Sequence, residues 1–299
     1  MIVALGKRLQ HNLVSLCGTT RTSCRLPKFY RSSRRDTIME RQAADYRTLS
    51  SLKNALHALK CFTPEEPELG ITQIADKLGL SKSTVHRVMT TLAEEGFVRR
   101  DEQTHRYRLG LSVLSLGGII MSNLEICREG QHLLEEFVNR FDETVHLAVL
   151  EDYATVYVSK LECKHPVQIA THLGRKNPLH CTSSGKVILA YQDSTVIDEV
   201  IRRGLRPMTP NTITHPDTLR QLLSQIRKDG YAFSQSELRE GVHSVAAPVR
   251  DYTRQVIGAV TAVGPAARFT PEKMKSLAKT LVSISKEISH RLGYYERIR

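Results

Sequence analysis

The chain has 299 residues, of which 40% are hydrophobic and 25% are charged, and it carries a formal net charge of +12. This length accommodates two domains and the apolar content is sufficient for a core in each, which excludes a wholly disordered chain. Residues 1–35 contain eight Lys and Arg and no Asp or Glu, so the rest of the chain is only mildly basic and its total charge is no argument for nucleic-acid binding.

The first segment, residues 1–45, is predicted to be a basic extension outside the folded domains. It shows no sustained helical or strand periodicity, and it contains the Ser- and Arg-rich run RSSRRD. Three interpretations stay open: a flexible arm that contacts phosphates nonspecifically, a leader similar to a transit peptide, or a start codon assigned too early.

Residues 46–109 are predicted to form a winged helix-turn-helix domain. An apolar stripe from Leu49 to Leu59 predicts a first helix, and two prolines then interrupt the chain. A second helix follows, with Thr72 as a candidate cap and Gly79 as its end. Its apolar residues recur at i, i+3, i+4 and i+7: Ile71, Ile74, Ala75 and Leu78.

A third helix begins after a turn of only a few residues, which is the spacing of a helix-turn-helix. Ser81 is a favourable N-cap, and the apolar stripe from Val85 to Leu92 gives this helix a buried face. The opposite face carries hydroxyls and cations of the kinds that reach phosphates and base edges in a major groove. The candidate DNA contacts of this helix are Lys82, Ser83, Thr84, His86, Arg87 and Thr90. The alternative is an ordinary helical pair with a solvated charged face.

A basic hairpin is predicted after the third helix. Phe97–Arg100 and Arg106–Leu109 have the composition of two short strands, and the polar residues 101–105 provide the turn. Four arginines give this hairpin the character of a wing that touches the DNA backbone. Arg106 and Tyr107 are its candidate DNA contacts.

Residues 110–124 are predicted to be a linker helix. The stretch Leu111–Met121 is too apolar to stand alone in solvent, so we expect it to pack against a partner subunit, with burial inside its own chain as the alternative. The longest uncharged stretch, Leu109–Leu124, is too short and too polar to span a bilayer, and the apolar run Ile2–Leu5 is too short for a signal peptide. We therefore expect no membrane partner and a cytoplasmic location. The six cysteines lack metal-ligand spacing, which is typical of reduced thiols.

From residue 125 to 299 the chain has the pattern of a mixed α and β domain. Helices are predicted at 126–141, 182–191, 216–228 and 270–292, and strands at 144–150, 155–161, 230–233, 242–250 and 256–263.

This second half contains three candidates for catalytic or metal-binding chemistry. The segment SSGK fails as a phosphate-binding loop, because that motif would need Gly at His180 and Ser or Thr at Val187. Cys181 next to His180 has no orienting third group, and adjacent residues seldom point to one place. Histidines 146, 165, 172 and 180 match no metal-ligand spacing, so no catalytic residue, metal or cofactor is predicted.

Several blocks of the chain together resemble the IclR family of bacterial transcriptional regulators. They are ITQIADKLGLSKSTVHRVMTTLAEEGFVRR followed by YRLG, then FDETVHLAVL, NPLHCTSSGKVILA, and GYAFSQSELREGVHSVAAPVRD leading into GAVTAVGP. These blocks cover about residues 48–292 in the family order, and they are more specific than a lone helix-turn-helix. The resemblance implies an α+β chain whose C-terminal domain is a GAF-like α/β effector-binding domain. It also favours Met39 as the true start.

The resemblance further implies a small-molecule pocket, whose residues carry over position by position. They are Ser183, Ser184, Ser234, Ser244, Thr261 and Val263. The first two stand at a helix start, where backbone N–H groups and the helix dipole favour a carboxylate. The alternative is that the serines are only caps and turn residues. Some relatives have Asp in place of Ser234 and a hydroxyl in place of Val263, which implies a bulkier or less polar effector here.

The sequence therefore predicts a transcriptional regulator that binds double-stranded operator DNA and whose operator affinity is controlled by a small carboxylate-bearing metabolite. The resemblance implies a homodimer or homotetramer. An enzyme acting on a small metabolite and fused to a DNA-binding module is the alternative.

Overall fold

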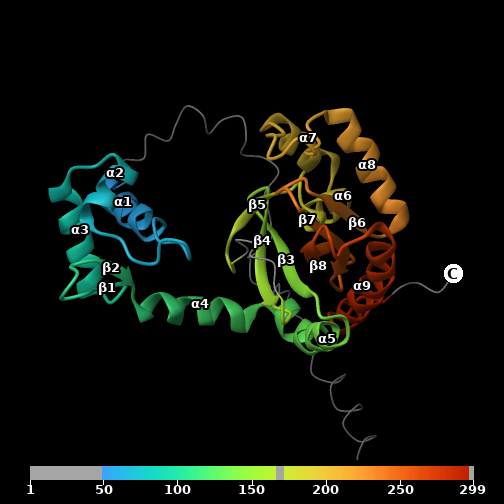
Figure 1. Ribbon diagram of the computed structural model, residues 1–299, viewed down its shortest axis with the longest axis horizontal. Coiled ribbons are helices and arrows are strands. Elements are labelled where there is room, and N and C mark those ends of the chain that lie inside the picture. The colour runs from blue at the N-terminus through green and yellow to red at the C-terminus, as the bar shows by residue number, and fades with distance from the viewer. Residues whose placement is uncertain (1–48, 166–171, 296–299) are drawn as a thin grey trace, which may run out of the picture. The chain divides into compact units, whose positions relative to one another are not determined.

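The computed structural model describes residues 49–165 and 172–295 (Figure 1). The predicted extension at 1–45, with Met39, lies outside the described residues. The DNA-binding part consists of three helices and a two-stranded hairpin. These elements are α1 (Ser50–Leu59), α2 (Ile71–Leu78), α3 (Lys82–Glu94), β1 (Val98–Arg100) and β2 (Tyr107–Leu109).

The turn between α2 and α3 is fixed by local chemistry at both of its ends. Helix α2 ends at Gly79, whose φ of 64° and ψ of 34° lie in the left-handed region that glycine adopts without strain. Helix α3 begins at Ser81, whose hydroxyl accepts from the Thr84 N–H at 3.2 Å, as the sequence predicted. The predicted cap Thr72 is wrong, because α2 begins at Ile71 and its N-cap is Gly70, two residues before Thr72.

Two further helices connect this part to the sheet domain in sequence: α4 (Leu111–Asn123) and α5 (Glu125–Phe141). Helix α4 has no buried residue, and five of its apolar side chains are more than half exposed: Leu111, Leu114, Leu116, Ile119 and Ile120. Among the described residues, no single helix is long and apolar enough to cross a membrane. The bent pair α4 and α5 passes that test only by length and composition.

The C-terminal domain is built on an antiparallel six-stranded sheet in the order β5-β4-β3-β8-β7-β6. The strands are β3 (Thr144–Glu151), β4 (Ala154–Leu161), β5 (Lys176–Pro178), β6 (Ala232–Gln235), β7 (Val242–Arg250) and β8 (Val256–Pro265). Strands β3 and β8, far apart in sequence, are neighbours, with His146 opposite Thr261. This pairing places the two central strands of the sheet side by side.

Helices cover both faces of this sheet (Figure 1). On one face, α5 and α9 (Pro271–Arg291) pack against alternate residues of the strands, among them Val145, Val245 and Val260. The other face receives α6 (Ser183–Ala190), α7 (Ser194–Arg202) and α8 (Pro216–Asp229). Since side chains alternate along a strand, His146, Ser244 and Thr261 belong to this second face.

Two elements, α7 and β5, were not predicted. Strand β5 has only three residues, too few to show a period of two, and it exists because it pairs with β4. Helix α7 did leave a signal, since Asp193 stands at its N-cap position and Ile197 and Val200 are its buried residues.

Candidate DNA interface and effector pocket

The exposed face of α3 carries the predicted DNA contacts. Lys82, Ser83, His86, Arg87 and Thr90 are exposed, and Thr84 is half-buried. Part of their hydrogen-bonding capacity is used within the helix: the Thr90 hydroxyl donates to the His86 carbonyl at 3.0 Å, and the Ser83 and Thr84 hydroxyls each lie 2.9 Å from Ser81 Oγ. The cations Lys82 and Arg87 have no ion pair or side-chain hydrogen bond among the described residues, which leaves both charges available to an anionic partner.

The two predicted DNA contacts of the hairpin, Arg106 and Tyr107, lie on opposite sides of it. Arg106 is exposed and donates from Nη2 to Gln73 Oε1 on α2 at 3.0 Å. Tyr107 is 2% exposed and packs in the core of this part, and its backbone pairs with Leu69. Because alternate residues of a strand point to opposite sides, a basic face with Arg106 and Arg108 requires Tyr107 to point inward. Tyr107 is thus a core residue and not a surface contact.

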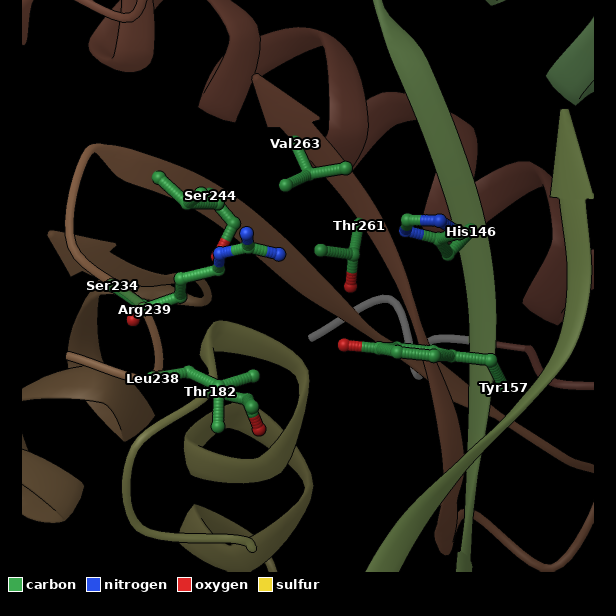
Figure 2. Close-up of a pocket in the computed structure, with 10 residues that line it drawn as sticks. His146, Tyr157, Thr182, Ser234, Leu238, Arg239, Ser244, Thr261 and Val263 are labelled. Atoms are coloured by element: carbon green, nitrogen blue, oxygen red, sulfur yellow. The ribbon is translucent and has the colours of Figure 1, made fainter. Parts of the chain in front are cut away.

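A hollow of about 430 Å³, the solvent at its mouth included, lies between the sheet and the start of α6 (Figure 2). Four of the six predicted effector residues line it: Ser234, Ser244, Thr261 and Val263. They meet there because β6, β7 and β8 are adjacent, with Ser234 opposite Ser244 and Ser244 opposite Val263.

The other two predicted residues, Ser183 and Ser184, are buried at the start of α6 and do not line the hollow. The Ser183 hydroxyl lies 2.7 Å from Ser244 Oγ, so it holds a lining residue in place. Thr182, the N-cap of α6, lines the hollow itself, and its hydroxyl accepts from the Gly185 N–H at 3.0 Å. As the first residues of the helix, Ser183 and Ser184 have backbone N–H groups without an acceptor inside it.

Sequence reasoning missed several lining residues, among them three with strong chemistry: His146, Tyr157 and Arg239. In Figure 2 the Arg239 guanidinium, the Thr261 hydroxyl and the Tyr157 hydroxyl all point into the same space. Tyr157 reaches it from β4 and stacks on His146, with ring centroids 4.8 Å apart. No sequence signal marked these residues, because the positions of His146 and Tyr157 depend on the register of β3 and β4, and that of Arg239 depends on the pairing of β6 with β7.

Several groups around the hollow are uncharged and buried. Burial lowers the pKa of His146 to about 3, with a smaller effect of the same sign from Lys160. Burial raises the pKa of Tyr157 to about 12. Thr261 Oγ1 is also buried and has no hydrogen-bond partner among the described residues. The lining thus offers neutral polar groups, with Arg239 as its cation.

A buried ion pair stands behind the first turns of α6. Lys186 Nζ donates to Glu237 Oε1 at 2.5 Å, and the two residues are 1% and 8% exposed. Burial lowers the pKa of Lys186 and raises that of Glu237, while each partner's charge opposes the effect of burial on the other.

The features that would suggest an enzyme have structural explanations. Burial raises the pKa of the Cys181 thiol to about 12, which removes the thiolate needed for a nucleophile. His180 Nε2 donates to the Arg206 carbonyl at 3.0 Å. Within residues 49–165 and 172–295, no three His, Cys, Asp or Glu side chains group to hold a metal ion.

Two family models match the chain. The model of the bacterial transcriptional regulator IclR C-terminal domain covers residues 119–290, and the IclR helix-turn-helix domain model covers residues 51–102. Among similar proteins is the HTH-type transcriptional regulator KdgR of Escherichia coli, which is 30% identical over 78% of this chain and 89% of its own length. Such relatives are transcriptional regulators, and not enzymes.

Solved structures agree with the sequence matches. The Thermotoga maritima IclR is 32% identical, with a TM-score of 0.70 over 83% of this chain and 100% of that one. An IclR homologue from Microbacterium hydrocarbonoxydans, solved in complex with 4-hydroxybenzoate, is 24% identical and shares the fold, with a TM-score of 0.70 over 80% of this chain and 99% of that one.

Proposed function

This chain belongs to the IclR family of bacterial transcriptional regulators, and we propose that its affinity for operator DNA is set by a small carboxylate-bearing metabolite bound in the hollow beside α6. The observation that carries this proposal is the buried Thr261 hydroxyl. It faces the hollow without a hydrogen-bond partner among the described residues. A buried polar group without a partner costs free energy, and a polar ligand would supply the missing bond.

The carboxylate part of the proposal depends on charge. Thr182, the N-cap of α6, lines the hollow, so the positive end of this helix dipole lies beside it, and Arg239 adds a positive charge on its wall. Neutral His146 and Tyr157 bring no negative charge, and Tyr157 keeps its proton for donation. The bound 4-hydroxybenzoate of the Microbacterium relative is an acid of this chemical class.

The DNA contacts are proposed from α3 and the hairpin. Lys82, Arg87 and Arg106 place three cations on the exposed side of the helix-turn-helix, and the short hydroxyl side chains between them fit a major groove. Tyr107 is left out of this surface because it is buried.

The partner of α4 is proposed to be a second copy of the chain. A helix that is apolar on all sides is normally buried, yet Leu111 is 82% and Leu114 70% exposed. Helix α4 follows the winged domain directly in sequence, and helix-turn-helix proteins read two half-sites as symmetric dimers. A dimer, or a tetramer made of two dimers, therefore covers this helix.

The experiment begins with a duplex selected from random DNA by the purified full chain. Fluorescence anisotropy with and without 4-hydroxybenzoate, gluconate and pyruvate then measures the change in operator affinity, and calorimetry measures the affinity for each acid. Coupling of this kind amounts to about 1 to 3 kcal/mol, and linkage requires that operator DNA change the acid's affinity by the same factor.

Ser244→Phe fills the hollow and is expected to abolish the response while leaving ligand-free DNA binding nearly normal. Ser224→Phe, at an exposed position of α8, is the matched control. An acid that binds equally well to both variants would place the site elsewhere. An acid that binds but leaves operator affinity unchanged would contradict its role as an effector.

A further inference from the structure

We infer that a second hollow of the C-terminal domain binds a small organic anion with an apolar or aromatic body. This hollow encloses about 690 Å³, the solvent at its mouth included, and shares no lining residue with the effector pocket. It lies where the turn after β3, the end of β5 and the C-terminal end of α7 meet, and Tyr153, Pro178 and Arg203 represent these three elements in its lining.

One wall of this hollow carries a guanidinium that is already oriented. Arg203 lies over the Tyr153 ring, with Cζ 4.0 Å from the centroid, and its Nε donates to Glu199 Oε1 at 2.8 Å. Stacking and the Nε bond fix the plane of the group, while its Nη atoms have no hydrogen-bond partner among the described residues. Paired Nη donors in a fixed plane match the two oxygens of a carboxylate.

A second guanidinium, that of Arg206, borders the same hollow. Its side chain is exposed and has no ion pair or hydrogen bond among the described residues, while its carbonyl accepts from His180 Nε2. Two arginines, Arg203 and Arg206, line the hollow, and no acidic residue among the described ones does. Glu199 is shared by Arg202 and Arg203. Asp152 beside the rim pairs with Lys176. The lining is therefore positive and favours an anion.

The floor of this hollow is apolar, which indicates that the uncharged part of the ligand is apolar too. Leu179 and Val200 are 1% and 6% exposed at its base, and at the rim Tyr153 and Met208 are 38% and 47% exposed. A planar or apolar body would cover these two exposed side chains and bury their surface. A purely polar anion such as inorganic phosphate would gain nothing from that floor.

The two hollows are joined by the segment 178–182. His180 lines the second hollow and Thr182 lines the effector pocket. Between them, the Cys181 carbonyl accepts from Ser234 Oγ at 3.1 Å, and Ser234 also lines the effector pocket. A ligand in the second hollow therefore contacts the same segment that lines the effector pocket. Binding in the second hollow does not rest on the proposed function.

Binding of the probe 4-fluorobenzoate to the full chain is measured by fluorine NMR. The uncharged control compound is 4-fluorobenzyl alcohol. Arg206→Ala is expected to raise the dissociation constant of one bound fluorine signal at least tenfold. Arg202→Ala is the matched control, since Arg202 is also an exposed arginine but does not line the hollow, and it is expected to leave that signal unchanged. The signal is expected to persist in Ser244→Phe and to be absent with the alcohol.

The outcomes separate this inference from the proposed function. Loss of all probe binding in Ser244→Phe, equal behaviour of Arg206→Ala and Arg202→Ala, or no saturable binding in the wild type would each overturn the second site. A signal that responds only to Arg206→Ala, with none responding to Ser244→Phe, would support the second site while counting against the effector pocket.

Discussion

Lys186 and Glu237 form a salt bridge of 2.5 Å that joins α6 to the segment after β6 inside the C-terminal domain. The same segment is held from outside, because the Thr212 hydroxyl donates to the Glu237 carbonyl at 2.6 Å. Glu237 Oε2 has no hydrogen-bond partner among the described residues, so the charge of Lys186 is its main compensation. This pair fixes α6, and with it the helix start that faces the effector pocket.

Breaking this pair from one side is expected to destabilise the domain strongly. Lys186→Met or Glu237→Leu leaves one buried charge uncompensated, which costs about 3 to 5 kcal/mol of unfolding free energy, whereas the double variant is expected to recover much of the loss. Urea unfolding of the four proteins gives the coupling energy. Lys176→Met, which removes an exposed pair with Asp152, is the control and should change little. Additive single effects would show that the two charges do not depend on each other.

The buried His146 is expected to make the folded chain less stable as the pH is lowered. Its pKa is about 3 in the folded chain against 6.5 in the unfolded chain, so between these values the unfolded state binds the extra proton. The contribution of His146 to the free energy of unfolding is fully present above about pH 6.5 and is lost as the pH falls. The loss between pH 7 and pH 5 amounts to about 2 kcal/mol. His146→Asn does not titrate, so its urea midpoint should fall less over this range. Parallel curves for the two proteins would contradict the assignment.

Arg87 is expected to contribute to sequence readout and Arg106 to backbone attraction. Arg87→Ala should cost about 1 to 3 kcal/mol on a selected operator and less on random DNA, because a base contact is lost. Arg106→Ala should weaken both duplexes to a similar degree and reduce the salt dependence by about one unit of slope. Anisotropy titrations measure both, with Lys228→Ala on α8 as the control. Unchanged affinities in both variants would remove α3 and the hairpin from the interface.

A charge on α4 is expected to dissociate the oligomer. Leu114→Glu replaces a side chain that is 70% exposed in the single chain and that a dimer would cover, so sedimentation should show a shift to monomer. Ser224→Glu introduces the same charge at an exposed position of α8, outside this helix, and should remain oligomeric. If Leu114→Glu keeps the wild-type mass, a second copy does not cover this helix.

The sequence by itself determined the elements whose signals are local. The short turn at Gly79 and the cap at Ser81 predicted the helix-turn-helix, since both depend only on neighbouring residues. The strand predicted at 256–263 is likewise present as β8. Tyr107 shows the limit of this reasoning: its position beside Arg106 indicated a DNA contact, but the strand turns it into the core.

Only the tertiary structure decided which faces meet. The pairing of His146 with Thr261 joins strands more than a hundred residues apart, and no local preference encodes that register. The same is true of Tyr157 and Arg239, which reach the effector pocket from different elements. Burial then changed their chemistry, because the pKa values of His146 and Tyr157 depend on desolvation and not on residue type. The pocket's neutral walls and its cation therefore result from long-range packing, which a single sequence does not specify.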